Sequence, residues 1–374
     1  MRFLLACAGT AGHINPALAV ANKLRETFPD AGFLFVGSGR DLEKSLIPAA
    51  GFELRNITIT GFARGMSPGD IKHNLKTARN LSVSRRECAQ ILDDFGPDAV
   101  IGTGGYVCYP VLKAAAKRGI PTLIHESNAV PGLTTKMLSG TVDKVMAAFG
   151  SVARECRKPE RVVITGTPIR EDFTRLDRAE AKRKLGLTGK PVVVSFWGSL
   201  GAEDMNSKMA DFIRLNARSG QMYHIHATGG GAAGTARMVE RLSTLGVYGL
   251  PDWEDLRPYI DNMGNLMAAA DLVLCRAGAS TLAELTALGR AAILVPSPYV
   301  TNDQQTKNAR EIERAGGAVV VTEEGCTGEQ LYNTAVSLLR DRERLAAMER
   351  DSARLGVRDA TDRILKVILE TMEK

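Results

Sequence analysis

One histidine follows an apolar segment near the start of the chain, within the stretch "FLLACAGTAGHINP". The apolar residues 3–7 have the pattern of a buried strand, and only Ala, Gly and Thr separate them from His13. Small residues let a ligand approach the backbone, and a helix that begins after them presents N–H groups to it. Core packing does not require a histidine here, and an imidazole with an ordinary pKa of about 6.5 suits proton transfer. We therefore predict a strand, a ligand-binding loop that carries His13, and a helix opened by Pro16.

The spacing of this loop excludes two common nucleotide-binding motifs. It is not a P-loop, because no G-K-[ST] follows, and the G-x-G-x-x-G order of a dinucleotide fingerprint is absent. The next strand ends in "FVGSGR", without an acidic residue for the ribose of NAD, although Arg40 leaves NADP formally open. The loop therefore predicts no cofactor.

Polar side chains also follow other predicted strands. Glu126 and Asn128 lie in "HESNAVPG", and Arg170 in "GTPIRED" can neutralise a diphosphate. In "CRAGASTLAEL" a helix would begin at Gly278 and direct its N-terminus at an anion, and Glu284 could accept both hydroxyls of a ribose. Alone, Glu284 would be interpreted as an ordinary surface glutamate. The amides of "SPYVTNDQQTKNA" suit sugar hydroxyls. Core packing does not predict such clusters, so together they indicate a ligand site.

The histidine pair and the cysteines are the residues whose types could bind a metal. His224 and His226 in "MYHIH" would lie on one face of a strand, but no third ligand is evident. The six cysteines are scattered and include no C-x-x-C pair, which favours reduced thiols in a cytosolic compartment over disulfides or a zinc site. The sequence therefore predicts no metal site.

Apolar β-branched runs alternate with amphipathic stretches, which predicts an α/β fold of parallel sheets covered by helices. Both halves begin with an apolar strand and a Gly loop, "FLLACAGTAGH" and "VVVSFWGSLGA". The pattern indicates two Rossmann-like domains joined near "TGTPIRED", with ligands expected at the carboxyl ends of the strands. The predicted strands cover residues 2–8, 32–37, 98–102, 121–126, 144–149 and 161–166, and then 191–196, 222–228, 271–275, 291–296 and 317–322.

Composition and charge limit the class of protein. With 374 residues, 44% hydrophobic and 24% charged, the chain has the balance of a globular protein of two or three domains. The net charge of +6 is concentrated in residues 55–86, which hold seven basic side chains against Asp70 alone. A nucleic-acid partner is not predicted, because aromatic residues are only 5% of the chain.

The basic segment, residues 62–86, has the pattern of a helix that starts at Ser67 and Pro68. On such a helix Lys72, Lys76 and Arg79 would lie beside an apolar face. It could rest on an anionic membrane surface, or it could be a core-facing stripe with a solvated flank.

Seven motifs together resemble the MurG family, transferases that carry N-acetylglucosamine from UDP to an undecaprenyl-linked muramyl-pentapeptide. In the family's order they are "AGTAGHINPALAVA", "GTGGYVCYP", "HESNAVPGLTTKML", "GTPIR", "GSLGA", "CRAGASTLAEL" and "VPSPYVTNDQQTKNA". The resemblance implies a GT-B fold, two Rossmann-like domains whose parallel sheets face each other across a cleft. It implies an acceptor-binding, membrane-facing domain at residues 1–166, with a C-terminal helix of about 357–374 packed back on it, and a UDP-GlcNAc-binding domain at residues 167–356.

The implied reaction is an inverting hexosyl transfer, without a cofactor or metal, from UDP-GlcNAc to the 4-hydroxyl of MurNAc in undecaprenyl-pyrophosphoryl-MurNAc-pentapeptide. This step converts lipid I to lipid II in peptidoglycan synthesis, and its implied place is the cytoplasmic face of the inner membrane, as a peripheral protein. The implied general base is His13, with Glu126 as its competitor. The implied donor-binding residues are Arg170, Ser199, Ile260, Ala279, Glu284, Gln304 and Gln305. The implied acceptor-binding residues are Gly9, Thr10, Gly12, Gly104, Gly105, Tyr106 and Asn128.

Several residues depart from the family's usual pattern, namely Ala8, Ala11, Ser127, Thr167 and Trp197. Trp197 replaces a glycine before "GSLGA" and is the hardest to accommodate. Other functions remain open at this point: a hydrolysing UDP-GlcNAc 2-epimerase, a non-catalytic sugar-nucleotide-binding protein, or a glycolipid synthase with a diacylglycerol acceptor.

Overall fold

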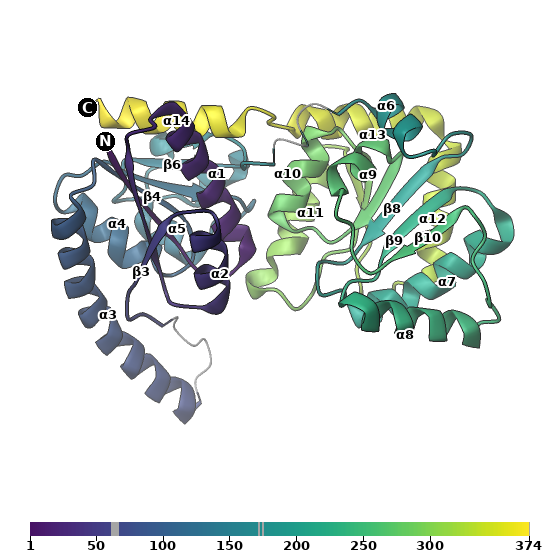
Figure 1. Ribbon diagram of the computed structural model, residues 1–374, viewed down its shortest axis with the longest axis horizontal. Helices are drawn as coiled ribbons and strands as arrows, with labels where there is room; N and C mark the ends of the chain where they lie inside the picture. Colours follow the sequence, from purple (N-terminus) through teal and green to yellow (C-terminus); the bar gives the residue numbers. More distant parts are fainter. Residues whose placement is uncertain (61–66, 171–172, 174–175, 374) are drawn as a thin grey trace. The chain divides into compact units, whose positions relative to one another are not determined.

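In the computed structural model the chain folds into two units, and residues 1–60, 67–170, 173 and 176–373 are described. For residues 68, 70–79 and 81 the description is limited to the backbone. Unit 1 comprises Met1–Ile169 and Asp359–Lys374, and unit 2 comprises Arg170–Arg358 (Figure 1). The end of the chain therefore belongs to the same unit as its beginning.

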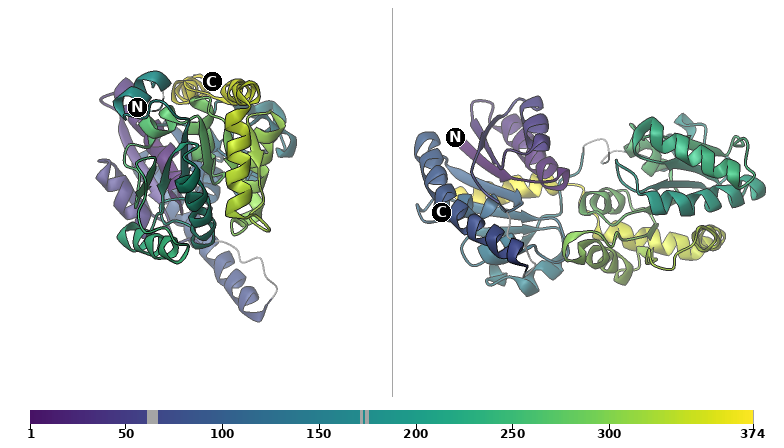
Figure 2. Two further views of the ribbon diagram at one scale, coloured as in Figure 1. Left: turned by 90° about the vertical axis from the view of Figure 1, so that its right-hand side faces the viewer. Right: turned by 90° about the horizontal axis from the view of Figure 1, so that it is seen from below.

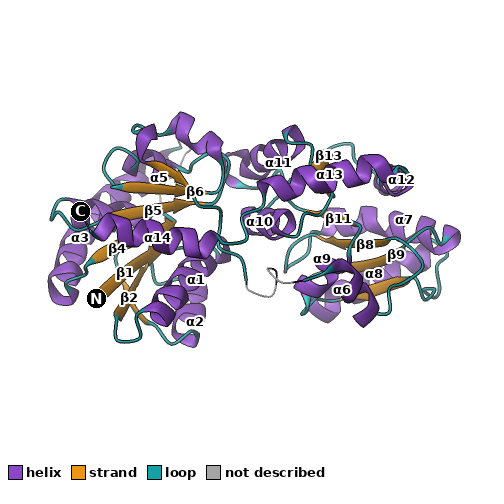
Figure 3. Cartoon of the chain, turned by 90° about the horizontal axis from the view of Figure 1, so that it is seen from above, coloured by secondary structure: helices purple, strands orange, loops and turns teal. Residues whose placement is uncertain are grey.

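Unit 1 is built on seven parallel strands in the order β3-β2-β1-β4-β5-β6-β7 (Figure 3). In register, Leu4 of β1 lies opposite Leu34 of β2 and Val100 of β4. The strands are β1 (Arg2–Cys7), β2 (Gly32–Gly37), β3 (Glu53–Asn56), β4 (Ala99–Gly104), β5 (Thr122–Glu126), β6 (Lys144–Ala147) and β7 (Val162–Ile164). The helices are α1 (Ala11–Thr27), α2 (Asp41–Ala49), α3 (Pro68–Phe95), α4 (Cys108–Ala116), α5 (Leu133–Leu138) and α14 (Ala360–Met372), with short 3₁₀ turns at Gly150–Glu155 and Pro159–Arg161.

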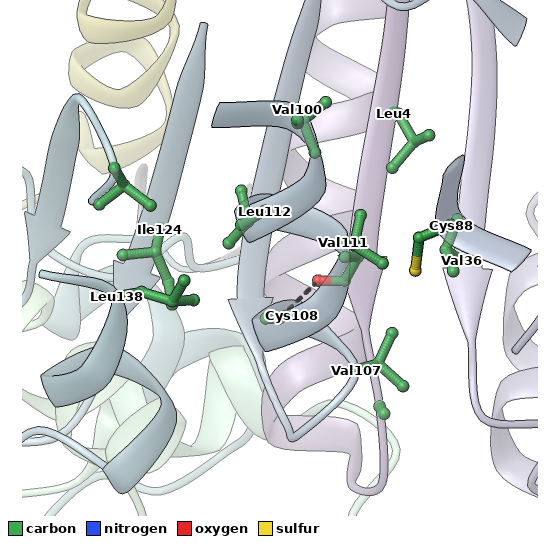
Figure 4. Packing of buried hydrophobic residues seen from close by; sticks show 14 of the residues in the cluster. Leu4, Val36, Cys88, Val100, Val107, Cys108, Val111, Leu112, Ile124 and Leu138 are labelled. Carbon is green, nitrogen blue, oxygen red and sulfur yellow. Dashed lines mark hydrogen bonds between the residues drawn. The ribbon is translucent and has the colours of Figure 1, made fainter. Parts of the chain in front are cut away.

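Successive residues of β1 point to opposite faces of the sheet and enter separate cores. Leu4 packs in the cluster formed with α3, α4 and α5, which Figure 4 shows. In that cluster the Cys108 thiol of α4 donates to the carbonyl of Ala6 at 3.1 Å. Leu5 packs on the other face, with residues of α1, α2 and α14. Both faces of the sheet are therefore buried, which explains the continuous apolar run of β1.

The C-terminal helix α14 completes the second of these cores. Its residues Ile364, Val367 and Ile368 are buried in the same cluster as Leu5 of β1. An ion pair of 2.8 Å joins Lys23 of α1 to Asp362 of α14. Among the described residues, no helix, α14 included, has the length and apolar character needed to cross a bilayer.

Unit 2 repeats this arrangement with six parallel strands in the order β10-β9-β8-β11-β12-β13. Helices cover both faces of its sheet (Figure 2). The strands are β8 (Val192–Phe196), β9 (Tyr223–Ala227), β10 (Glu254–Arg257), β11 (Leu272–Cys275), β12 (Ala292–Leu294) and β13 (Ala318–Val320). The helices are α6 (Arg178–Lys184), α7 (Glu203–Ser219), α8 (Gly231–Thr244), α9 (Met263–Ala269), α10 (Ala279–Ala287), α11 (Gln304–Arg314), α12 (Gly328–Arg340) and α13 (Arg342–Leu355), with a 3₁₀ turn at Thr301–Asp303.

The sequence missed two strands and misplaced one helix start. Both missed strands, β3 with "ELRN" and β10 with "EDLR", lie at a sheet edge and pair on one side only. The expectation that Pro16 opens the first helix is wrong, because α1 begins at Ala11. The N–H groups of His13 and Ile14 both bond to the carbonyl of Thr10, which closes the first turn before the proline is reached. His13 therefore lies on the first turn of a helix and not on a loop.

Candidate active site

Three loops meet at the carboxyl edge of the unit 1 sheet, where the strand order reverses between β1 and β4. Parallel sheets bind ligands at such a point, because the loops diverge there and leave room between them. The loops are residues 8–10 after β1, 105–107 after β4 and 127–132 after β5. The residues predicted for the acceptor lie on these loops or at the element ends beside them: Gly9, Thr10, Gly12, Gly104, Gly105, Tyr106 and Asn128.

His13 is half-buried at the start of α1, and its ring is held from one side. Its Nδ1 lies 2.8 Å from the carbonyl oxygen of Ala8, which can only accept, so Nδ1 carries the proton. In the neutral ring the lone pair is then on Nε2. Thr103 also donates to the His13 carbonyl at 2.7 Å and ties the first turn of α1 to β4. The imidazole therefore has a defined tautomer and one nitrogen that can accept a proton.

Two glycines after β4 make room for this histidine and its loop. A Cβ on Gly104 would lie 2.4 Å from Cδ2 of His13, and a Cβ on Gly105 would lie 2.6 Å from the carbonyl oxygen of Ala8. Their φ angles of 125° and 86° are also ones that side chains rarely adopt. The "GTGGY" motif is therefore a requirement of close packing against the His13 loop.

Glu126 is buried at the end of β5 and is engaged by its own loop. Its carboxylate accepts from the N–H of Asn128 at 3.1 Å, the Asn128 amide at 3.0 Å and the N–H of Gly132 at 2.9 Å. The hydroxyl of Thr135 donates to it at 2.7 Å. A carboxylate bonded in this way closes the 127–132 loop, and its lone pairs are already in use. This geometry favours His13 over Glu126 as a proton acceptor.

In unit 2 the structure brings together Arg170 and Glu284, two residues that the sequence selected separately. Glu284 is half-buried on α10, and its Oε1 lies 3.8 Å from Nε of Arg170. The guanidinium of Arg170 also lies 4.8 Å from the ring centre of Phe173. Helix α10 begins at Ala279, about one and a half turns before Glu284, with Gly278 as its N-cap. A carboxylate, a guanidinium and a helix N-terminus thus occur in one region of unit 2.

Two further loops lie at the carboxyl ends of β8 and β9. Ser199 is exposed in the first, and its carbonyl accepts from the N–H of Gly230 in the second. A Cβ on Gly201 would lie 2.2 Å from the carbonyl oxygen of Thr228, so the two loops are packed backbone to backbone. Trp197 does not fill this region: it is 3% exposed and packs into the core of unit 2.

The glutamines predicted for the sugar follow a turn of unusual conformation. Asn302 and Asp303 have φ angles of 59° and 51°, and they are the positive-φ residues other than glycine in the described part of the chain. Such backbone is more common at functional sites than elsewhere. Gln304 and Gln305 begin α11 directly after it, and Oε1 of Gln305 accepts from the N–H of Ser297 at 2.9 Å. Ile260, predicted beside the uracil, is buried in the loop after β10.

His224 and His226 share one strand face, as predicted, but they belong to a core network. The hydroxyl of Ser195 lies 2.8 Å from Nε2 of His224 and 2.7 Å from Nδ1 of His226. Glu254 holds the other nitrogen of His224 at 2.9 Å. Across the described residues, no group of three or more His, Cys, Asp or Glu side chains is placed to hold a metal ion.

Glu43, which the motifs in the sequence do not single out, lies beside the His13 loop. Its carboxylate is buried and accepts from the N–H of Gly9 at 3.0 Å. The signal available was a glutamate three residues after the end of "GSGR", the place of the acid in the capping box that opens α2. Arg40, at the N-cap of the same helix, lies with its guanidinium 5.7 Å from the ring centre of Tyr106.

Comparisons with known proteins agree over the full length of the chain. "Glycosyltransferase family 28 N-terminal domain" matches residues 3–147, and "Glycosyltransferase family 28 C-terminal domain" matches residues 192–364. A relative from Acetivibrio thermocellus is 42% identical over 374 residues, covering 100% of this chain and 99% of its own. It is named "UDP-N-acetylglucosamine--N-acetylmuramyl-(pentapeptide) pyrophosphoryl-undecaprenol N-acetylglucosamine transferase". A relative of the same name from Bacillus cytotoxicus is 38% identical and covers 100% of both chains.

Solved structures support the fold. The crystal structure of Acinetobacter baumannii MurG matches with a TM-score of 0.79 at 24% identity, covering 99% of each chain. A UDP-GlcNAc 2-epimerase from Neisseria meningitidis, bound to UDP-GlcNAc, matches with a TM-score of 0.64 at 13% identity, covering 99% of this chain and 100% of its own. At these identities the likeness establishes the GT-B arrangement of two Rossmann-like units and not the reaction.

Proposed function

The chain belongs to the MurG family of glycosyltransferases, and we propose on this premise that it transfers N-acetylglucosamine from UDP-GlcNAc to undecaprenyl-pyrophosphoryl-MurNAc-pentapeptide. The observation that carries the proposal is 42% identity over the whole chain to a relative named for this reaction. Two structures titled as UDP-GlcNAc 2-epimerases share the fold at 13–14% identity, so the sequence favours transfer over epimerisation.

In the proposed reaction unit 1 binds the acceptor and His13 acts as general base. Nε2 of His13 accepts the proton of the MurNAc 4-hydroxyl while the oxygen of that hydroxyl attacks the anomeric carbon of the donor. The bond from that carbon to UDP breaks on the opposite side, which converts an α-linked donor into a β-1,4-linked product. The Nδ1–H bond to Ala8 supports this role, because it places the lone pair on Nε2.

Unit 2 binds the donor in this proposal, and it supplies positive charge for the departing UDP. Glu284 accepts the ribose hydroxyls, and Ile260 lies beside the uracil. Arg170, Ser199 and the N–H groups at Ala279 stabilise the diphosphate, so that no metal is required. Gln304 and Gln305 contact the N-acetylglucosamine.

We also propose that the protein binds the cytoplasmic face of the inner membrane through residues 62–86. The support is the concentration of basic residues there and the long helix α3, whose first turns extend away from the rest of unit 1 in Figure 1. The side chains of Lys72, Lys76 and Arg79 lie outside the described residues. Reversal of these three charges should weaken binding to anionic liposomes, at about 1 kcal/mol for each cation lost. Unchanged binding would contradict this membrane contact.

The direct test uses purified protein, radiolabelled UDP-GlcNAc and a short-chain analogue of the lipid-linked muramyl-pentapeptide, with and without EDTA. Label in the lipid product that persists in EDTA would establish metal-independent transfer. The anomeric configuration of that product, read from its proton coupling, would decide between inversion and retention. Conversion of UDP-GlcNAc to its 2-epimer without acceptor, or donor binding without turnover, would replace the proposal.

A further inference from the structure

Glu43 is a charged residue with no exposed surface, and its partners are donors from two loops, residues 38–40 and Gly9. Its carboxylate accepts from the N–H groups of Ser38 at 2.7 Å, Gly39 at 2.9 Å and Arg40 at 3.3 Å, and from the Ser38 hydroxyl at 2.8 Å. The N–H of Gly9, 34 residues away, donates to it at 3.0 Å. A buried carboxylate needs such donors, because burial removes its hydration. Local capping explains the first four bonds, but not the bond to Gly9.

The N–H of Gly9 and the carbonyl of Ala8 belong to one peptide group. That N–H donates to Oε1 of Glu43, and that carbonyl accepts from Nδ1 of His13 at 2.8 Å. A continuous path therefore runs from the Glu43 carboxylate through the Ala8–Gly9 peptide to the imidazole. Hydrogen bonds in such a chain polarise one another, so a negative charge on the N–H side makes the carbonyl oxygen a stronger acceptor.

We infer that Glu43 is a positioning residue of the proposed reaction: through the Ala8–Gly9 peptide it fixes the orientation and the Nδ1–H tautomer of His13. The arrangement has the logic of a carboxylate that orients a catalytic histidine, with a peptide group inserted between them. The inference rests on the proposed function for its catalytic consequence, although the tautomer itself can be measured without any substrate.

The backbone conformation of Gly9 is one that residues with a side chain rarely adopt, which supports a specific role for the Ala8–Gly9 peptide. Its φ is 97°, a value that turns the N–H toward α2 while the preceding carbonyl faces α1. Glycine adopts this conformation without steric cost. A Cβ on Gly37 would lie 2.6 Å from Oε2 of Glu43, so the strand end before the loop also leaves space for the carboxylate.

The first experiment is a ¹⁵N NMR spectrum of protein labelled with ¹⁵N-histidine, recorded at a pH where His13 is neutral. The chain has five histidines, so a His13→Gln variant assigns the signal. We expect Nδ1 of His13 to be protonated and Nε2 to be unprotonated in the native protein. A native Nε2–H tautomer would overturn the inference before any variant is made.

The second experiment compares Glu43→Gln with the matched variant Glu87→Gln. Glu87 also accepts a backbone N–H and a hydroxyl in unit 1, both from Thr58, and among the described residues these bonds do not lead to His13. Glu43→Gln should give a mixed tautomer of His13 and lower kcat by about tenfold to a hundredfold, as loss of an outer-shell partner does elsewhere. Glu87→Gln should change neither. In both variants the KM for UDP-GlcNAc should stay within about twofold. A loss of folded protein alone would lower activity but would not change the tautomer of His13, so the tautomer distinguishes the two causes.

An unchanged His13 tautomer in folded Glu43→Gln overturns the inference, whatever happens to activity. If Glu43→Gln does not show a cooperative melting transition, Glu43→Asp replaces it. The aspartate side chain is shorter by one methylene, so its carboxylate is withdrawn from the N–H of Gly9, and the same change of the His13 tautomer is expected. Should the protein transfer no sugar to any acceptor, the proposed function fails, while the tautomer measurements still decide the link between Glu43 and His13.

Discussion

At the scale of single residues, the site of unit 1 depends on backbone that only glycine can supply. Gly104 lies against the ring of His13, and Gly105 lies against Ala8. The ring of His13 therefore has little freedom to move, and it fits its position because Gly104 and Gly105 have no Cβ atoms. The carboxylate of Glu126 is likewise fixed, because it accepts from backbone N–H groups of its own loop.

Replacement of Gly104 by alanine should displace His13. The added Cβ would lie 2.4 Å from Cδ2 of His13, so the ring or the loop must shift. A displacement of about 1 Å costs about a hundredfold in rate, so kcat should fall by that order while donor binding persists. Gly119→Ala is the control, because Gly119 also has a positive φ of 71° but has open space for a Cβ. Equal losses of kcat in the two variants would mean that backbone strain, and not displacement of His13, is responsible.

Glu284→Gln should weaken donor binding specifically. An amide has one oxygen to accept with, whereas the carboxylate has two for the ribose hydroxyls of the proposed donor, and the pair with Arg170 would be lost as well. A hydrogen bond to a charged group is worth about 1.5–3 kcal/mol, so the KM for UDP-GlcNAc should rise by about tenfold or more. Steady-state kinetics with each substrate varied in turn is the measurement. Glu240→Gln, an exposed change on α8, should leave both KM values unaltered.

At the scale of elements, strands β8, β9 and β10 are joined by a buried network with one consistent proton arrangement. Asn206 donates its amide to the Thr228 carbonyl, so its oxygen faces Nε2 of His226, which must carry a proton. Nδ1 of a neutral His226 then accepts from Ser195, whose oxygen accepts in turn from Nε2 of His224. The histidine pair is therefore a structural unit of the sheet.

This network predicts acid sensitivity of unit 2. Burial, followed by the charge of His224, lowers the pKa of His226 to about 3 from its ordinary value of 6.5. Between pH 6.5 and pH 3, His226 is therefore protonated in the unfolded chain but not in the folded chain. The free energy of unfolding should fall as pH drops through this range, by up to about 1.4 kcal/mol per pH unit. Urea unfolding between pH 7 and pH 4 measures this slope. The variant His226→Asn should be less stable at pH 7 but should show a shallower slope, and an identical slope would contradict the assignment.

At the scale of the whole molecule, the two units repeat one strand order, and the end of the chain returns to the first unit. Helix α14 buries Ile364, Val367 and Ile368 in a core that contains residues of β1 and α1. Unit 1 is therefore incomplete until the last residues of the chain have been made. Its stability should depend on a segment that follows unit 2 in the sequence.

Ile368→Ala should accordingly destabilise unit 1 and not unit 2. Removal of a fully buried isoleucine costs about 2–5 kcal/mol, because it leaves a cavity in the α1–α14 core. Hydrogen exchange can assign the loss, and protection should fall in β1 and α1 while β8 and β11 keep theirs. Lys366→Ala, an exposed change on the same helix, is the control. Equal loss of protection in β8 would show that the two units unfold as one.

The repeated order of strands and helices can be predicted from the sequence alone, because buried parallel strands are continuous apolar runs with a detectable pattern. Every one of its eleven predicted strands is present, and its polar clusters do lie at strand ends. The motif resemblance further identified the family, which the full-length relatives confirm.

Features that depend on partners far apart in sequence could not be predicted in this way and are seen only in the folded chain. Strands β3 and β10 form by pairing with the edges of β2 and β9, since their own residues show no alternation of apolar and polar side chains. The start of α1 at Ala11 follows from bonds to the Thr10 carbonyl, which no propensity of Pro16 reveals. Glu43 meets Gly9 across 34 residues because β1 and β2 are adjacent in the sheet. Periodicity records which face of an element is buried, but it does not record which distant group completes a hydrogen bond.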